Sequence, residues 1–167
     1  MALNKSRLRE AILAELRAHS VLTLATIGEA GPHAVSLMYA HDGFDIYWLS
    51  DPKTLHSEHL ASNPSAAVTI AAQYEDFRKI RGLQLHGKGC HLNDKKDAAA
   101  GFDLLALRYP FLQKFSAGKL AHHLGAAAIY RFQPARLTLI DNAQGFGSKQ
   151  TLELSDQADE SMAQDRQ

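Results

Sequence analysis

Three short apolar stretches lie close together in the sequence, and the turns between them are too short for anything but antiparallel strands. They are "VLTLAT" at residues 21–26, "HAVSLMYA" at 33–40 and "FDIYWLS" at 44–50. The first and third are rich in β-branched and aromatic residues, which favour strands. "GEAGP" and "HDG" separate them, and glycine and proline mark turns. Because a parallel connection needs about a dozen residues or more, this region predicts an antiparallel meander.

The rest of the chain predicts helices attached to further strands. Apolar residues recur at helical spacing over residues 4–19, and Asp94 is placed to cap a helix that Pro110 ends. The remaining expected elements are a helix between Pro52 and Asn63-Pro64, strands at 66–72, 78–92, 127–134 and 136–141, and one or two short helices within 111–124. This order predicts a small antiparallel barrel with flanking helices, in the α+β, mainly β class.

The expected domain organisation is simple. Residues 1–154 are predicted to form a single domain, because a chain of 167 residues suits one domain with a substantial core. Residues 155–167, "SDQADESMAQDRQ", are polar and carry little apolar mass, so we expect a disordered tail.

Composition excludes several classes of function. Lys plus Arg and Asp plus Glu number 18 each, which argues against non-specific nucleic-acid binding because that needs a basic surface. Cys90 is the only cysteine, so neither an intramolecular disulfide nor a cysteine-based zinc cluster is expected. No apolar run is long enough to cross a bilayer, and the N-terminal residues lack the apolar core of a signal peptide. We therefore expect a cytoplasmic protein with neither a nucleic-acid nor a membrane partner.

The stretch "YWLSDPKTLHSEHLASNP", residues 47–64, contains the strongest candidate binding site. Ser50 ends a strand, and Lys53, Thr54 and His56 crowd the start of the next helix. A helix N-terminus presents unpaired N–H groups and the positive end of a dipole. Lysine adds a charge, threonine a hydroxyl, and histidine a donor whether neutral or charged. Together these groups suit a phosphate monoester.

The same stretch also allows a simple capped helix or a metal site. Asp51 is a natural N-cap whose carboxylate could satisfy the N–H groups itself, and composition alone favours such a capped surface helix. A metal site has less support. His56 and His59 stand three residues apart on the helix without a third ligand, and the adjacent His122 and His123 point in different directions on a helix. We therefore assign no metal ligand.

Several remaining features of the sequence are expected to have structural roles. "GFGSK" at 145–149 is expected to be a glycine turn before the last strand, and the lone cysteine is expected to be buried. Arg81 and Gln84 would face solvent or form a polar rim near a ligand at a subunit interface. Tyr47 and Trp48 lie on opposite faces of their strand, so one should pack in the barrel and the other cover a flat ring or a partner.

Taken in order, these motifs resemble a known family. The matching pieces are "TLATIGEAGPHAVSLMYAHDGFDIYWLS", "KTLHSEHLASNP", "AAVTI" and "RGLQLHGKG". In order and spacing they are similar to the pyridoxamine 5'-phosphate oxidase-like, FMN-binding split barrels. "RYPF" and "IDNAQGFGSK" make the chain most similar to the YhbP-like (UPF0306) branch. The resemblance covers about residues 10–150.

The resemblance implies a homodimer with FMN bound in a groove between the subunits. It places the cofactor-binding residues on three segments: Val35, Ser36 and Leu37 beside the flavin ring, Leu49 and Ser50 near the ring edge and ribityl chain, and Lys53, Thr54 and His56 at the phosphate. Thr54 falls where the family has a phosphate-binding serine or threonine, and His56 falls where many members have lysine. On the strength of the resemblance, phosphate binding becomes the favoured interpretation of this helix.

The chain also departs from the family pattern. Gly82 stands where true oxidases often have a glutamine that contacts the flavin, and the C-terminal segment whose arginine and tryptophan grip the pyridoxal substrate has no counterpart. We therefore expect a redox flavoprotein that acts on an unidentified small molecule, not a pyridoxamine phosphate oxidase. No catalytic residue is assigned; His33 and Tyr39 are the candidates considered.

Two alternatives stay open. Relatives of this fold also bind haem or deazaflavin in the same groove, and a haem would need a ligand such as His56, His86, His91 or His123. The second alternative is a non-enzymatic binding or sensing protein that has lost the cofactor, which the altered phosphate motif favours.

Overall fold

An antiparallel sheet of eight strands forms the centre of the protein. The strands follow the order β2-β1-β5-β6-β7-β4-β3, and β8 pairs with β7. The computed structural model describes residues 3–115 and 127–154. The strands are β1 (Val21–Gly28), β2 (Gly31–Met38), β3 (Ala40–Asp42), β4 (Asp45–Ser50), β5 (Ser65–Ala71), β6 (Arg81–His91), β7 (Ala128–Asp141) and β8 (Lys149–Glu153). The end strands β2 and β3 do not pair with each other, so the described sheet is a split barrel, as the sequence predicted.

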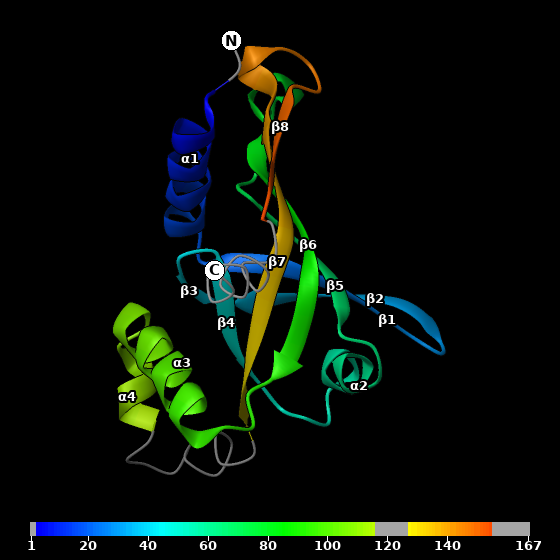
Figure 1. Ribbon diagram of the computed structural model, residues 1–167, viewed down its shortest axis with the longest axis vertical. Helices are drawn as coiled ribbons and strands as arrows, with labels where there is room; N and C mark the ends of the chain where they lie inside the picture. Colours follow the sequence, from blue (N-terminus) through cyan, green and yellow to red (C-terminus); the bar gives the residue numbers. More distant parts are fainter. Residues whose placement is uncertain (1–2, 116–126, 155–167) are drawn as a thin grey trace, which may run out of the picture.

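The helices lie on different sides of this sheet. They are α1 (Lys5–Ala18), α2 (Leu55–Ser62), α3 (Lys95–Arg108) and α4 (Phe111–Phe115), with short 3-10 turns at η1 (Phe77–Lys79) and η2 (Asn142–Gln144). Figure 1 shows α1 beside the upper half of the long β6–β7 pair, α2 on one side of its lower end, and α3 and α4 on the opposite side. Among the described residues, no helix has both the length and the apolar character needed to span a membrane.

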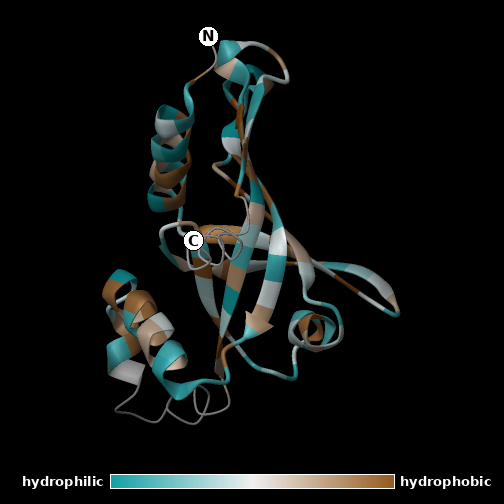
Figure 2. Ribbon diagram, in the orientation of Figure 1, coloured by the Kyte–Doolittle hydropathy of each residue, from teal (hydrophilic) through white to brown (hydrophobic). Residues whose placement is uncertain are grey.

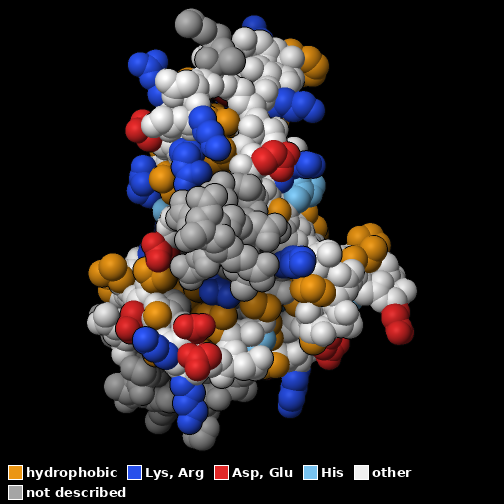
Figure 3. All heavy atoms as spheres, viewed as in Figure 1, with side chains coloured by type: hydrophobic (Ala, Val, Ile, Leu, Met, Phe, Trp, Pro, Cys, Tyr) orange, Lys and Arg blue, Asp and Glu red, His pale blue; other side chains and the backbone are white. Residues whose placement is uncertain are grey.

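Helix α1 covers one end of the core with an amphipathic face. The Asn4 side chain caps it by accepting the Arg7 N–H at 2.9 Å, and Leu8, Ile12 and Leu16 form its buried side. Apolar and polar bands alternate along α1 in Figure 2, and Lys and Arg side chains gather over its outer surface in Figure 3. The helix predicted over residues 4–19 is therefore confirmed.

The strand predicted over residues 33–40 is two strands in the structure. The break falls at Tyr39, whose side chain is buried and whose hydroxyl donates to the Leu16 carbonyl oxygen at 2.8 Å. Burial raises the pKa of this hydroxyl, so it is a structural anchor and a poor acid-base group. The candidate acid-base role for Tyr39 is thus not supported.

The two late strands predicted at 127–134 and 136–141 are one long strand, β7. Its irregularity is a β-bulge at which Gly87 of β6 pairs with Pro134 and the neighbouring His86 with Arg136. Pro134 is tolerated at the bulge because its missing N–H interrupts no regular ladder bond there. A Cβ on Gly87 would lie 2.1 Å from the Gln133 carbonyl oxygen, so this close approach of two backbones requires glycine.

Two apolar clusters fill the space on either side of β4. Trp48 is fully buried in the larger one, where it stacks on Tyr130 with ring centroids 5.6 Å apart. Tyr47 points the opposite way and packs against the cluster under α3. The opposite orientations were predicted, but α3 covers Tyr47. Asp94 caps α3 as expected, accepting from the N–H groups of Lys96 and Asp97.

Some predicted features lie outside the described residues. Of the helices expected within 111–124, only α4 is described, and His122 and His123 fall beyond it. The tail predicted at 155–167 also lies outside the described part. The glycine turn before the last strand is present, with Gly145 and Gly147 at positive φ between η2 and β8.

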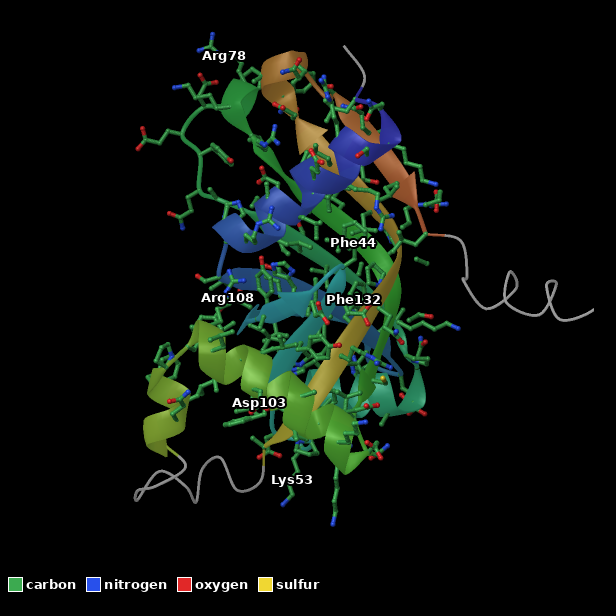
Figure 4. The ribbon with its side chains drawn as sticks, turned by 60° about the vertical axis from the view of Figure 1, so that its left-hand side comes forward. Phe44, Lys53, Arg78, Asp103, Arg108 and Phe132 are labelled. Carbon is green, nitrogen blue, oxygen red and sulfur yellow. The ribbon has the colours of Figure 1, made fainter. Side chains whose placement is uncertain are left out.

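Replacing Arg108 with alanine should destabilise the protein. Its guanidinium group donates to the carbonyl oxygens of Leu16, Arg17 and His19 at the end of α1 and lies over the Tyr39 ring (Figure 4). Charged hydrogen bonds of this kind contribute about 1.5–3 kcal/mol. We expect Arg108→Ala to lower the free energy of unfolding in urea by about that amount. Arg108→Lys keeps the charge and should recover only part of the lost unfolding free energy. A urea midpoint that is unchanged in Arg108→Ala contradicts this role.

Candidate functional site

The first turn of α2 begins without a side-chain cap. Thr54 occupies the N-cap position and makes no capping hydrogen bond with its side chain. The Asp51 carboxylate accepts the Lys53 N–H at 2.8 Å in the preceding loop, so the prediction that Asp51 caps the helix is wrong. Within the described part of the chain, the first N–H groups of α2 are therefore left without a side-chain acceptor and keep the positive end of the helix dipole available.

A compact group of hydroxyls and an imidazole lies beside this helix start. The Ser50 Oγ is 2.6 Å from the His56 Nε2 and 3.3 Å from the Thr54 Oγ1. The Thr54 Oγ1 is 3.1 Å from the same Nε2 and 2.9 Å from the Ser57 Oγ. The Thr54 hydroxyl also donates to the Asp51 carbonyl oxygen at 2.8 Å. The structure thus brings together three residues that the sequence predicted at one site, and adds Ser57.

Two further histidines complete the cluster. The His33 ring, on β2, is parallel to the His56 ring with centroids 6.3 Å apart, and its centroid lies 6.1 Å from that of the His59 ring in an edge-on contact. The His59 Nδ1 is 3.1 Å from the Thr26 Oγ1, and Thr26 pairs with His33 across the β1–β2 hairpin. The i, i+3 spacing of His56 and His59 signals that they share a helix face, but only the hairpin register reveals that His33 meets them.

The surroundings of His56 favour its neutral form. The residue is 5% exposed. Burial lowers the pKa of His56 below its ordinary value, and the neighbouring His33 and His59 lower it further. Near neutral pH the ring is therefore uncharged and hydrogen-bonded to hydroxyls, in contrast to a lysine, which would carry a permanent charge at this position.

The remaining predicted cofactor residues lie apart from this cluster. Lys53 precedes the helix, is exposed and points into solvent at the end of the molecule (Figure 4). Leu49 packs on the opposite face of β4 against the cluster under α3. Val35 and Leu37 are half-buried on the inner face of β2, whereas Ser36 is exposed on its outer face. Because β2 is an end strand of the described sheet, backbone groups along its free edge are available to a ligand.

The contacts of the polar residues decide between the alternatives raised for them. His56 bonds with Ser50 and His59 with Thr26, so the two rings do not converge. Over residues 3–115 and 127–154, no three His, Cys, Asp or Glu side chains are arranged to hold a metal. Arg81 forms ion pairs with Glu15 and Asp141, each at 2.5 Å, so it ties β6 to α1 and to the end of β7.

Two smaller expectations for β6 had different outcomes. Gln84 is exposed on the strand, which agrees with a solvent-facing position. Cys90, expected to be buried, is exposed. The alternating pattern of the strand shows why: Gly89 faces Leu60 and Trp48 in the core, which turns Cys90 outward.

The arrangement around α2 fits a phosphate group. It offers free helix N–H groups, hydroxyls on Ser50 and Ser57 and an imidazole, all of which can donate to phosphate oxygens. The Thr54 hydroxyl can join them by rotating its proton away from the Asp51 carbonyl oxygen. The acidic residue of the first turn, Glu58, is exposed.

Comparison with known proteins supports the same interpretation of the fold. The family model described as pyridoxamine 5'-phosphate oxidase matches residues 8–141. A UPF0306 protein of Yersinia pestis bv. Antiqua (strain Angola) is 26% identical over 136 residues, which cover 80% of this chain and 85% of that protein.

Solved structures with less sequence similarity share the fold. General Stress Protein 26 from Bacillus anthracis str. Sterne is 16% identical with a TM-score of 0.65, covering 89% of this chain and 99% of that protein. A heme binding protein from Mycobacterium smegmatis is 17% identical with a TM-score of 0.69, covering 92% of this chain and 60% of that protein. At these identities the likeness concerns the architecture alone.

Protonation of His56 should reduce the stability of the protein. Because the folded-state pKa lies below that of the unfolded chain, the unfolded state binds more protons at this position. The stabilising contribution is complete above about pH 6.5 and is lost as the pH falls from there toward the folded-state pKa. Urea unfolding should therefore show a steeper loss of stability from about pH 7 to about pH 5 for the wild type than for His56→Gln. Parallel pH profiles contradict this expectation.

Proposed function

This chain belongs to the pyridoxamine 5'-phosphate oxidase family, and from that membership and the geometry beside α2 we propose that it is a homodimeric, FMN-binding flavoprotein of the cytoplasm. Bound flavin would supply electron transfer for a redox reaction on a small molecule, and the protein would hold and orient both partners. The single cysteine suits a reducing compartment.

The observation that carries the proposal is the donor group at the start of α2. Ser50, Thr54 and His56 lie within hydrogen-bond distance of one another at a helix end that no side chain of the described residues caps. A phosphate monoester would accept from these groups and from the helix N–H groups. Lys53, which is exposed, would act on the phosphate only as a nearby positive charge.

The flavin ring would lie along the free edge of β2. Val35 and Leu37 offer half-buried apolar side chains there, and within residues 35–37 the backbone groups that point away from β1 offer donors and acceptors at the free edge. Ser36 and Leu49 turn their side chains away from this space, so their role would be limited to the backbone. One subunit would cover only one side of the flavin ring, so a second protein surface is needed to cover the other side.

A second copy of the chain would supply that surface. Three large apolar side chains are open to solvent on the outer face of the β1–β2 hairpin: Val21 is 47% exposed, Ile27 50% and Met38 45%. Val21 lies directly opposite Met38 in the register, with Ala25 opposite Ala34 further along the hairpin. An apolar strip of this kind, next to the cofactor edge, supports a subunit interface there.

The proposed activity excludes the oxidation of pyridoxamine phosphate. Gly82 lies where β5, β6 and β7 meet, and a Cβ there would be 2.4 Å from the Ile70 carbonyl oxygen. The close approach of these strands leaves no space for the glutamine that true oxidases often carry at this position. The substrate is therefore expected to belong to another class of small molecule.

Haem is the second candidate ligand, because a fold neighbour is a heme binding protein. His56 and His59 already bond to hydroxyls, while His86 and His91 are exposed on β6, away from the hydroxyl cluster. The hydroxyls at the start of α2 are not ligands for haem iron, so this geometry favours a phosphate-bearing flavin. His123 lies outside the described residues.

Replacing Thr54 should weaken FMN binding. Thr54→Val removes the central hydroxyl of the donor group at nearly constant volume, and one hydrogen bond to a charged acceptor corresponds to about a tenfold change in Kd. Lys53→Ala should have a smaller effect, which added salt reduces. Affinity is measured by quenching of flavin fluorescence, with the exposed and distant Lys79→Ala as the matched control. Unchanged affinity in the double variant Lys53→Ala/Thr54→Val would make the phosphate assignment wrong.

Charging the apolar strip should separate the subunits. We expect sedimentation to give a dimer for the wild-type protein and a monomer for Ile27→Glu/Met38→Glu, because burying two carboxylates at an interface is costly. The monomer should remain folded, since both side chains already contact solvent. A wild-type monomer at micromolar concentration would contradict the interface.

A further inference from the structure

Two histidines from different elements face each other beside the phosphate-binding residues. His33 comes from the inner face of β2 and His56 from the first turn of α2, and their rings are nearly parallel, with an interplanar angle of 6°. His56 is buried whereas His33 is half-buried, so the pair opens toward solvent on the side of His33.

The two rings differ in their hydrogen bonds. The His56 Nε2 already contacts the Ser50 and Thr54 hydroxyls. No hydrogen bond joins the His33 ring to another residue of the described part of the chain, which leaves both of its ring nitrogens free for a ligand. His59, the third ring, is held by Thr26 and sits behind the pair.

The charges around the pair favour an added anion. Neutral groups from three elements contact the rings: Thr26 and Gly28 of β1, Ser50 of β4 and Thr54 at the start of α2. Asp51 and Lys53 in the preceding loop are exposed. Among the described residues, no carboxylate contacts either ring to balance a proton there. In the free protein, burial and the neighbouring rings lower the pKa of His56.

We propose that His33 and His56 form a two-histidine clamp that binds the phosphate of a phosphate monoester together with one proton, so that the ligand itself supplies the counter-charge that the cluster lacks. The clamp rests on the proposed phosphate site and adds His33 to it. The balance is simple: a dianionic phosphate binds, one proton from solvent is taken up by the histidine pair, and no covalent bond changes. A lysine at position 56 would bind the same group without proton uptake.

The clamp makes affinity depend on pH and on the phosphate. Proton-linked binding weakens as the pH rises, by at most about tenfold per pH unit for one proton. The second ionisation of a phosphate monoester lies near pH 6, so above about pH 6.5 the ligand is dianionic. Any pH dependence of the affinity above that pH therefore comes from the protein. Riboflavin, which lacks the phosphate, should bind weakly and without this dependence.

The test is calorimetric titration of the protein with FMN between about pH 6.5 and about pH 8.5, in pairs of buffers with different ionisation enthalpies. We expect about one proton taken up and a Kd that rises with pH. His33→Gln should lower both proton uptake and affinity at the acidic end. His56→Lys should bind FMN without proton uptake, and His86→Gln, on an exposed strand position, serves as the matched control.

Histidine resonances provide a readout that does not require flavin. Inorganic phosphate should move the imidazole signals of His33 and His56 toward their protonated positions. If the His56→Lys protein does not fold, His56→Gln, a smaller and uncharged variant, takes its place. Tight FMN binding with no proton uptake and a flat Kd overturns the clamp but leaves the flavoprotein proposal standing. If FMN does not bind yet phosphate protonates the pair, the FMN proposal fails and the clamp stands. If neither occurs, both fail.

Discussion

The packing of α2 against the β1–β2 hairpin is the contact on which the site depends. Gly28 has no side chain, and a Cβ there would lie 2.4 Å from the His59 ring, so the helix can approach the hairpin only because this position is glycine. The hairpin register then places Thr26 opposite His33, directly beneath the histidines of α2. With α2 seated there, its first turn meets Ser50 at the end of β4.

The chemistry of the site follows from its neutral lining. Hydroxyls, imidazoles and helix N–H groups surround the start of α2, and Lys53 in the preceding loop points into solvent. In the proposed phosphate site, this lining would receive a dianion without a permanent buried charge in the empty protein, and such a charge is costly to bury. By the resemblance, His56 stands where many family members have lysine, and Gly82, which close strand packing confines, stands where true oxidases often have glutamine. The chain thus keeps the architecture of its family with a different polar lining.

Local sequence patterns predicted the features that depend on interactions between residues close together in the chain. Cap chemistry predicted the helix after Asp94, and the polar side chains that crowd the helix start after Ser50 predicted that Thr54 and His56 share one site. Long-range packing decided the rest. Tyr39 breaks a strand because its hydroxyl reaches α1, and Lys53 turns outward because it lies in the loop before the helix begins. The contribution of His33 depends on hairpin register, which a periodic pattern alone leaves open.

The most direct test of flavin binding is the visible absorption spectrum of the freshly purified protein, followed by titration with FMN. We expect the bands of oxidised flavin, or tight uptake of added FMN by a protein isolated without it. A Soret-type band would contradict the flavoprotein proposal and identify a haem protein. A spectrum without bands, together with no uptake of FMN, would contradict it as well and show that the fold has been kept without the cofactor.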